Sequence, residues 1–353
     1  WNDPNTWSNS EGGPPAGSIP TVGNIVYIKG YTVTVIGTDC GELYIEVLND
    51  HTSLIIDADT LNVHGSLTMI NNGADYDGII IVRNSGGLNI DDDFILNRAG
   101  GANEFSVTVN DNSFIYVARD LNILSSAGTV FENQFTLNGT STVQIDQDIN
   151  LDNSGGQKIN IQLNTSSELT VLRDISISAT AQDQVELELN NNSYLNIAGD
   201  IIRGATAYGI LDGNDNSTVS FNSTQYLQII PQNTGSGTDD FSYQNITINN
   251  SRIASPQLSL EGDVSVPGTL TLTDGNVLTT ASDLLTLENG ASVAGGSSNS
   301  YIEGPVEKIG NAAFTFPVGK DGNYKPVSIS APSNAADAFI AEYFNENPDG
   351  TYD

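Results

Sequence analysis

Six decapeptides between residues 61 and 204 repeat one alternation of apolar and polar residues. Each starts with an apolar, a polar and an apolar residue, as in Leu61-Asn62-Val63, and alternation resumes after a short corner. The copies begin at Leu61, Leu88, Ile115, Val143, Leu169 and Leu195, which are 27, 27, 28, 26 and 26 residues apart, and a weaker seventh copy begins at Val219. A fixed period of this length is typical of a repeat architecture.

A further alternating stretch precedes four of these decapeptides, so one period contains three short strands and three turns. The stretches are Phe105–Val109, Gln134–Leu137, Ile159–Leu163 and Val185–Leu189. Alternation at period two indicates a strand with one buried face, whereas the spacing of an amphipathic helix is absent from the sequence. The pattern predicts an all-β protein, a right-handed parallel β-helix with three strands and 26–28 residues per coil.

Asparagine recurs at the end of the first strand of successive coils. The positions are Asn84, Asn110, Asn138, Asn164 and Asn190. Asparagine tolerates the left-handed conformation of a sharp corner, and its amide can bond the equivalent amide one coil away. We therefore predict a structural role for these five residues.

Aspartate recurs at the sixth place of five decapeptides, at Asp93, Asp120, Asp148, Asp174 and Asp200. Carboxylates stacked one coil apart repel each other by about 1 kcal/mol per neighbour even in water. Solvation with bonds to turn amides is one way to offset this repulsion, and a bound cation, Ca²⁺ for an oxygen-only site, is another. Arg119 and Arg173 precede two of these residues and are expected to neutralise part of the column.

Charge and composition limit the classes of partner that are expected. The chain has 43 acidic and 11 basic residues, a formal net charge of −32, which disfavours nucleic acid and anionic membrane surfaces. No apolar run approaches the length of a membrane span, so we expect no direct membrane insertion. Cys40 is the one cysteine, which excludes a disulfide framework. The chain begins at Trp1 with no visible signal peptide, so we expect a removed leader or a longer parent protein.

Three regions are expected along the chain. Residues 1–50 predict an N-terminal cap, in which Trp1 and Trp7 cover the first coil and the strands 25–28 and 32–35 flank Gly30. Residues 51–300 predict the β-helix, with a break near 231–240 followed by shorter, differently phased coils. Residues 301–353 predict a small, truncated β module with prolines at edges or turns.

The loops that follow Asn72, Arg98, Leu124 and Leu151 differ between coils, and variable loops on a rigid stack are where recognition is expected.

A lyase-like arrangement of acids beside a basic residue could be formed by Asp91–Asp93 with Arg98, or by Asp120 with Arg119. A hydrolase would need two carboxylates at a set separation, and such pairs arise by chance among 43 acids. His51 and His64 predict no zinc site. We expect no enzymatic activity, with a polysaccharide-active enzyme or a carbohydrate-binding module as the alternative.

Two segments carry a resemblance to a known group of proteins. The first contains Trp1, Trp7, Ile19-Pro20, Gly23 and Gly30, and the second contains YIEGPVEK and FTFPVGKDGNYKPVSI, which begin at Tyr301 and Phe314. Both resemble secreted β-helical surface proteins of gliding and other Bacteroidetes-type bacteria, which use the type IX secretion route. The start is also similar to the eight-glycine domain of animal cell-surface proteins. Asn24-Ile25-Val26 departs from the Asp-x-Val that is usual there.

The resemblance covers residues 1–50 and about 241–345. It implies an extracellular cell-surface location and a structural or adhesive role, as a stalk or as a binding surface for a glycan or protein ligand. A passenger or subunit of a secretion or gliding assembly, in contact with outer-membrane machinery, is the further alternative that it implies.

Overall fold

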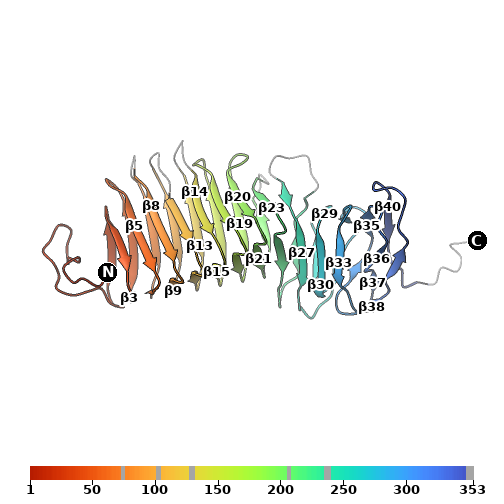
Figure 1. Cartoon of the computed structure of the whole chain (residues 1–353), viewed down its shortest axis with the longest axis horizontal. Coiled ribbons are helices and arrows are strands. Elements are labelled where there is room, and N and C mark those ends of the chain that lie inside the picture. The colour runs from red at the N-terminus through yellow and green to blue at the C-terminus, as the bar shows by residue number, and fades with distance from the viewer. Residues whose placement is uncertain (73–75, 101–104, 127–131, 205–207, 234–239, 347–353) are drawn as a thin grey trace, which may run out of the picture. The chain divides into compact units, whose positions relative to one another are not determined.

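Every regular element of the described chain is a β-strand. The computed structural model describes residues 1–72, 76–100, 105–126, 132–204, 208–233 and 240–346 (Figure 1). The chain divides into two compact units, one of residues 1–196 and 201–212 and one of residues 197–200 and 213–353. A helix long and apolar enough to cross a membrane is absent from these described ranges.

The first unit consists of three parallel sheets whose strands succeed one another coil by coil (Figure 1). The first sheet is β1 (Ile25–Lys29), β4 (Glu42–Val47), β7 (Leu67–Asn71), β10 (Phe94–Arg98), β13 (Leu121–Ser125), β16 (Ile149–Asn153), β19 (Ile175–Ala179) and β22 (Ile201–Arg203). The second contains β2 (Thr32–Val35), β5 (Thr52–Asp57), β8 (Gly78–Arg83), β11 (Phe105–Val109), β14 (Asn133–Leu137), β17 (Ile159–Leu163), β20 (Val185–Leu189) and β23 (Ile210–Gly213). The third contains β3 (Thr38–Cys40), β6 (Thr60–Val63), β9 (Gly87–Ile90), β12 (Phe114–Val117), β15 (Thr142–Ile145), β18 (Glu168–Val171) and β21 (Tyr194–Ile197).

The register of the third sheet confirms the predicted period. The first residues of successive decapeptides are direct partners, and the pairs are Leu61 with Leu88, Leu88 with Ile115, Ile115 with Val143, and Val143 with Leu169. The strands expected before the decapeptides are β11, β14, β17 and β20. The all-β parallel β-helix with three strands per coil is therefore confirmed.

Alternation within each strand places one apolar column inside the coil. In the second sheet the central inward positions are direct partners from coil to coil, and none is more than 1% exposed: Leu54, Ile80, Val107, Phe135, Ile161 and Leu187. Burial of such a side chain contributes about 1.5–3 kcal/mol. The ring of Phe135 also meets that of Phe94 from the first sheet, with centroids 6.2 Å apart. Packing across the interior thus joins the sheets.

The two strands after the N-terminal loop do not form a hairpin. β1 pairs in parallel with β4, and β2 pairs in parallel with β5, so both are sides of the first coil. The chain turns between them at Gly30, whose φ of 66° lies in the left-handed region that glycine adopts without strain. Residues 25–50 therefore take part in the same stacking as the later coils.

The two tryptophans lie against the edge of the first coil. Trp1 is only 7% exposed, and its ring meets that of Trp7 edge to face with centroids 4.8 Å apart. The Trp7 indole N–H donates to the carbonyl of Trp1 at 2.7 Å, and the Trp1 ammonium donates to the carbonyl of Thr34 in β2 at 2.8 Å. This segment occupies an edge carbonyl that no earlier strand is present to pair.

The second unit continues parallel stacking with shorter coils. One sheet contains β24 (Thr218–Phe221), β27 (Asn245–Asn249), β30 (Thr269–Asp274) and β33 (Ser292–Gly295). Another contains β25 (Gln228–Ile230), β28 (Leu258–Leu260), β31 (Val277–Leu278) and β34 (Ile302–Glu303). A third contains β29 (Val264–Val266), β32 (Leu285–Leu287), β35 (Val306–Ile309) and β40 (Ala338–Ala341). From β27 onward, direct partners in successive coils are 19 to 25 residues apart, as with Leu258 and Val277 or Val277 and Ile302. Residues 234–239 of the expected break lie outside the described residues.

Among the described strands, antiparallel pairing begins at β35, apart from isolated antiparallel bridges earlier in the chain. β35 is parallel to β32 but antiparallel to β40, and two short antiparallel pairs are formed by β36 (Phe314–Phe316) with β39 (Val327–Ile329) and by β37 (Gly319–Lys320) with β38 (Asn323–Tyr324). Pro305, Pro317 and Pro326 all lie outside strands, as the missing N–H requires. The expected C-terminal module thus begins with strands that still belong to the coil. Its residues 347–353 are outside the described residues, and the short strand β26 (Phe241–Ser242) lies earlier in the unit.

Truncation of the N-terminal cap predicts fraying of the first coils alone. Trp1→Ala removes the ring that meets Trp7, and loss of a packed tryptophan costs about 3–5 kcal/mol. Because each coil contacts mainly its neighbours, we expect faster amide exchange in β1 to β6 and unchanged exchange in β16 to β18. Hydrogen-exchange mass spectrometry measures both. Trp7→Phe, which retains a ring, is the control, and equal acceleration in all coils would contradict the capping role.

Candidate functional site

The most regular polar feature is the aspartate ladder, which we define as Asp93, Asp120, Asp148 and Asp174. Each residue immediately precedes a strand of the first sheet. The Oδ1 atoms of Asp93, Asp120 and Asp148 accept the backbone N–H of the next ladder residue at 3.3, 3.0 and 3.0 Å. Each carboxylate therefore ties one coil to the next through an amide. Bonds to turn amides are one of the two predicted ways to offset the repulsion.

The same arrangement recurs in the second unit. Asp200 Oδ1 accepts the N–H of Ile229, and Asp263 Oδ1 accepts the N–H of Leu284, both at 2.8 Å. In the sequence, Asp263 follows a glycine and precedes a strand, as Asp200 does. The structure gives the two residues equivalent hydrogen bonds. Aspartate before a strand has one local function in both units.

Two arginines contribute positive charge to the ladder from one coil further on. Arg119 Nη1 lies 2.8 Å from Asp92 Oδ1 and its Nε lies 3.8 Å from Asp93 Oδ1. Arg173 Nε lies 3.7 Å from Asp148 Oδ1. The hydrogen bond to Asp92 raises the pKa of Arg119, which favours the protonated guanidinium over the neutral form that a base requires.

Calcium needs six to eight oxygen ligands, more than one carboxylate per coil supplies. In the ladder, one oxygen of three of the aspartates already accepts an amide hydrogen. Within the described ranges, no three His, Cys, Asp or Glu side chains converge as a metal site requires. Calcium binding by Asp93, Asp120, Asp148, Asp174 and Asp200 stays a prediction.

The second polar feature is the asparagine ladder, formed by Asn110, Asn138, Asn164 and Asn190. Each amide nitrogen donates to the amide oxygen of the preceding member, at 2.9, 3.1 and 3.3 Å along the ladder. An amide both donates and accepts, so identical side chains stack without repulsion. The left-handed residues are those that follow the asparagine, such as Asn191 and Asn192 with φ of 50° and 62°.

Asn84 does not belong to this ladder, contrary to the prediction. Val82 is the partner of Val109, which places Arg83 and not Asn84 beside Asn110. The turn after Arg83 has the same length as the turn after Asn110, because Gly86 donates to the carbonyl of Arg83 as Ser113 donates to that of Asn110. Arg83 therefore occupies the place of the asparagine, and Asn84 occupies the place of Asp111. Asn84 itself has a φ of 56°. The 26-residue step from Asn84 to Asn110, against 27 for the neighbouring decapeptides, already indicated this shift.

Asp57, which lies in the preceding coil, bonds to the turn that follows Arg83. Its Oδ2 accepts from Arg83 Nη2 at 2.7 Å and its Oδ1 accepts from Asn84 at 2.7 Å. The hydrogen bonds from Asn84 and Arg83 lower the pKa of the Asp57 carboxyl. An ion pair thus replaces the amide-to-amide bond that the asparagine ladder uses.

A column of buried serines escaped the sequence analysis. Three residues after each ladder asparagine lies a serine that is at most 1% exposed: Ser113, Ser141, Ser167 and Ser193, with Ser217 equivalent in the second unit. The hydroxyl oxygens of these residues have no hydrogen-bond partner among the described residues. A buried hydroxyl without a hydrogen-bond partner lowers the free energy of unfolding by about 1–3 kcal/mol. The serine is small enough to fit a corner where a larger side chain would meet the next coil, and the recurring Asn-x-x-Ser was the available sign.

The loops between the first and second sheets start from a third buried column. Asn71, Arg98, Ser125 and Asn153 are direct partners, and all are at most 1% exposed. Asn153 Oδ1 accepts the N–H groups of Gly155 and Gly156 at 3.2 and 2.9 Å, and its amide donates to the carbonyl of Gln157 at 2.8 Å. These buried side chains fix the bases of the predicted recognition loops. Residues 73–75, 101–104 and 127–131 of those loops lie outside the described residues.

Arg98 cannot act with Asp91–Asp93 as a lyase base. Its side chain is wholly buried at the end of β10 and donates to Asn133 Oδ1 at 3.3 Å, whereas the three aspartates precede the same strand. The alternation Phe94, Leu96, Arg98 already directs this side chain inward. This lyase candidate is therefore wrong.

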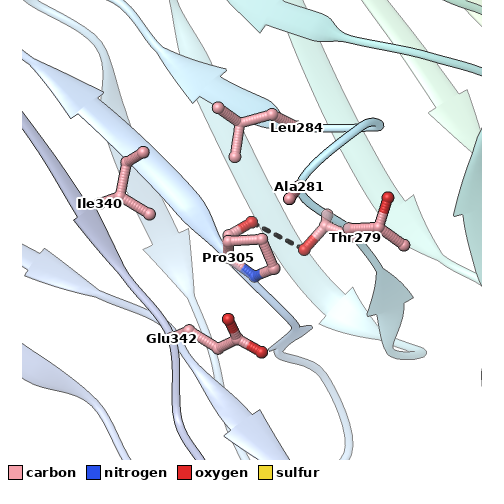
Figure 2. Close-up of a pocket in the computed structure, with 7 residues that line it drawn as sticks. Thr279, Ala281, Leu284, Pro305, Ile340 and Glu342 are labelled. Atoms are coloured by element: carbon pink, nitrogen blue, oxygen red, sulfur yellow. Dashed lines mark hydrogen bonds between the residues drawn. The ribbon is translucent and has the colours of Figure 1, made fainter.

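A shallow pocket of about 550 Å³ lies in the second unit beside β40 (Figure 2). Leu284, Ile340 and Pro305 contribute apolar surface, and Thr279 Oγ1 donates to the Pro305 carbonyl at 2.7 Å. Glu342 supplies the one carboxylate of its lining. Glycoside hydrolysis ordinarily uses a carboxylate pair, which this pocket does not offer.

His64 is held between acids of two neighbouring coils. Its Nδ1 lies 2.8 Å from Asp91 Oδ2 and its Nε2 lies 3.8 Å from Asp39 Oδ1. Beside it, Asn89 donates to Asn62 at 2.8 Å, and Asn62 donates to Asp39 at 2.7 Å. His64 and Asp91 both occupy the fourth place of a decapeptide, so the contact was readable from the repeat. The sequence analysis considered His64 only as a zinc ligand.

Comparison with known proteins identifies no relative. No family model matches the chain, and no curated protein or solved structure is detectably similar to it. The functional argument consequently depends on the chain's own geometry.

The aspartate ladder predicts different effects for two substitutions at one position. Asp120→Asn keeps an oxygen for the Asp148 amide and removes a charge, so we expect stability within about 0.5 kcal/mol of the parent or higher. Asp120→Ala leaves that amide without its acceptor and should cost about 1–3 kcal/mol. Urea unfolding measures both, with and without millimolar Ca²⁺. Equal losses in the two variants would refute the hydrogen-bond role, and a Ca²⁺-dependent gain that Asp120→Asn abolishes would establish a cation site.

The Asp57 contacts predict an acid-dependent loss of stability. Because the folded pKa lies below the ordinary 3.8, ionised Asp57 stabilises the fold fully above that value, and this contribution disappears as pH falls through the folded pKa. We expect the stability difference between the parent and Asp57→Asn to be constant from about pH 7 to 5 and to shrink below about pH 4. Urea unfolding across this range, with Asp50→Asn as an exposed control, measures it. A difference that grows on acidification would exclude the pairing.

Proposed function

We propose that this chain is a structural segment of an exported cell-surface protein, a rigid β-solenoid that holds a binding surface outside the cell. The observation that carries the proposal is the unbroken coil-to-coil register of the first unit, from β4 to β19, with side-chain ladders on its corners. Parallel bonds and ladders repeated at every coil favour a stiff support over a hinged one. The resemblance of the two terminal segments to secreted surface proteins supplies the location.

The ladders support a load-bearing role more than a catalytic one. In both the asparagine and the aspartate ladders, the polar atoms are used to join coils, at 2.9–3.3 Å and 3.0–3.3 Å. Catalytic groups need free, converging atoms that can meet a substrate. Groups already bonded to the neighbouring coil lack that freedom, which favours a structural assignment.

The charge of the chain favours an extracellular support that does not bind anionic partners. A net charge of −32 repels nucleic acid and anionic membrane surfaces. The two arginines beside the aspartate ladder reduce local repulsion without reversing the overall sign. We propose that the binding surface recognises uncharged or basic ligands.

A polysaccharide-active enzyme is the weaker candidate. Arg98 is buried away from Asp91–Asp93, Arg119 is paired with Asp92, and the pocket beside β40 has a single carboxylate. A role as passenger or subunit of a secretion or gliding assembly has the same cell-surface location and depends on the resemblance alone.

Surface location predicts accessibility on intact cells. Proteinase K applied to intact cells that produce the protein should degrade the chain, detected with antibody against the folded protein, because the proposed location leaves it outside the outer barrier. A cytoplasmic protein followed in the same samples is the control. Cleavage that occurs only after lysis would overturn the proposal.

A further inference from the structure

Two tyrosines stack on the outer face of the first sheet at its N-terminal edge. Tyr27 of β1 and Tyr44 of β4 are direct partners, with ring centroids 5.0 Å apart and an angle of 14° between the ring planes. β1 is the terminal strand of the sheet, so no described strand continues the stack beyond Tyr27. Tyr27 is 51% exposed. The Tyr27 ring thus stacks on a second ring, and about half of the Tyr27 side chain is exposed to solvent.

Stacking of the coils does not require these rings. The partner of Tyr44 in the next coil is Thr68, and Ile95 and Asn122 continue the same column in β10 and β13. The sheet forms with the same parallel register at those positions. An exposed aromatic pair is therefore a feature of the edge and not of the repeat.

Charged groups that can form hydrogen bonds surround the ring pair. Lys29 Nζ lies 5.4 Å from the centroid of Tyr27 and 2.8 Å from Glu46 Oε2. The Tyr44 hydroxyl donates to Glu42 Oε2 at 2.9 Å. The bond to Glu46 raises the pKa of Lys29, so the ammonium stays charged at neutral pH. A donor and two acceptors consequently lie beside an exposed aromatic ring, with the Lys29 ammonium over it.

We propose that the Tyr27–Tyr44 pair, with Lys29, Glu42 and Glu46, binds a neutral pyranose unit of a glycan. The apolar C–H face of the sugar stacks on the electron-rich face of the Tyr27 ring. The hydroxyls of the sugar accept from Lys29 and donate to the carboxylates, because a hydroxyl is both a donor and an acceptor. The net charge of −32 disfavours acidic sugars. This inference names a ligand class for the proposed surface protein and rests on that function.

Native gel electrophoresis of the purified full chain tests the site. The gels contain laminarin, hydroxyethyl cellulose, xylan or galactomannan, with polygalacturonate as the acidic comparison. We expect at least one neutral glycan to retard the protein and polygalacturonate not to. Tyr27→Thr, which copies the Thr68 found later in the column, should weaken retardation about fivefold, whereas Tyr27→Phe should retain it because the ring face remains.

Tyr194→Ala is the matched control, because Tyr194 is also an exposed tyrosine of the first unit, at 43%. Circular dichroism melting verifies that each variant is folded. The proposal fails if no neutral glycan retards the parent, if Tyr27→Thr binds as well as the parent, or if Tyr194→Ala weakens binding equally. These outcomes leave the cell-surface proposal intact, because protease accessibility on intact cells is independent of glycan binding in a gel.

Discussion

Parallel hydrogen bonding between successive coils is the constraint from which the other features of the first unit follow. Parallel strands lie about 4.8 Å apart, so every side chain has the equivalent side chain of the next coil as its neighbour. Each position must therefore accept a near copy of itself. Apolar residues satisfy this inside the coil, as the fully buried Leu54, Ile80 and Val107 do. At the corners, where polar residues are needed, the chain uses side chains that can bond their own kind or the backbone.

The two ladders solve this problem in different ways. Asparagine is self-complementary, so Asn138 donates to Asn110 and accepts from Asn164. Aspartate is an acceptor only, so it bonds the next backbone amide, and nearby arginines supply the opposite charge. Where Arg83 occupies the place of the asparagine, it forms an ion pair with Asp57 instead. The ladder chemistry thus depends on which residue occupies the corner, and a different residue at that one position changes the kind of interaction.

The sequence was sufficient for the coil and insufficient for its corners. Alternation and period are properties of many residues, so the errors of single positions average out, and the partners of Leu88 and Ile115 were predicted correctly. A corner depends on one residue, so Arg83 in the place of the asparagine leaves Asn84 one position outside the ladder. Burial of a polar side chain is also a property of the packed coil. The inward alternation of β10 identifies Arg98 as interior, whereas proximity in the chain alone paired it with Asp91–Asp93. The unpartnered hydroxyl of Ser167 follows from packing that no local pattern expresses.

The same constraint determines where distinct chemistry can arise. A residue within a column is restricted by its neighbours on both sides, so an unusual side chain there must fit two copies of the coil. This restriction is absent in the loops between the first and second sheets, and it is halved at the first coil, where Tyr27 has a strand on one side only. The ladders and the interior are thereby committed to support. Surfaces that contact other molecules are expected where the repeat starts or where the chain leaves it, and the exposed Tyr27 occupies the first of these places.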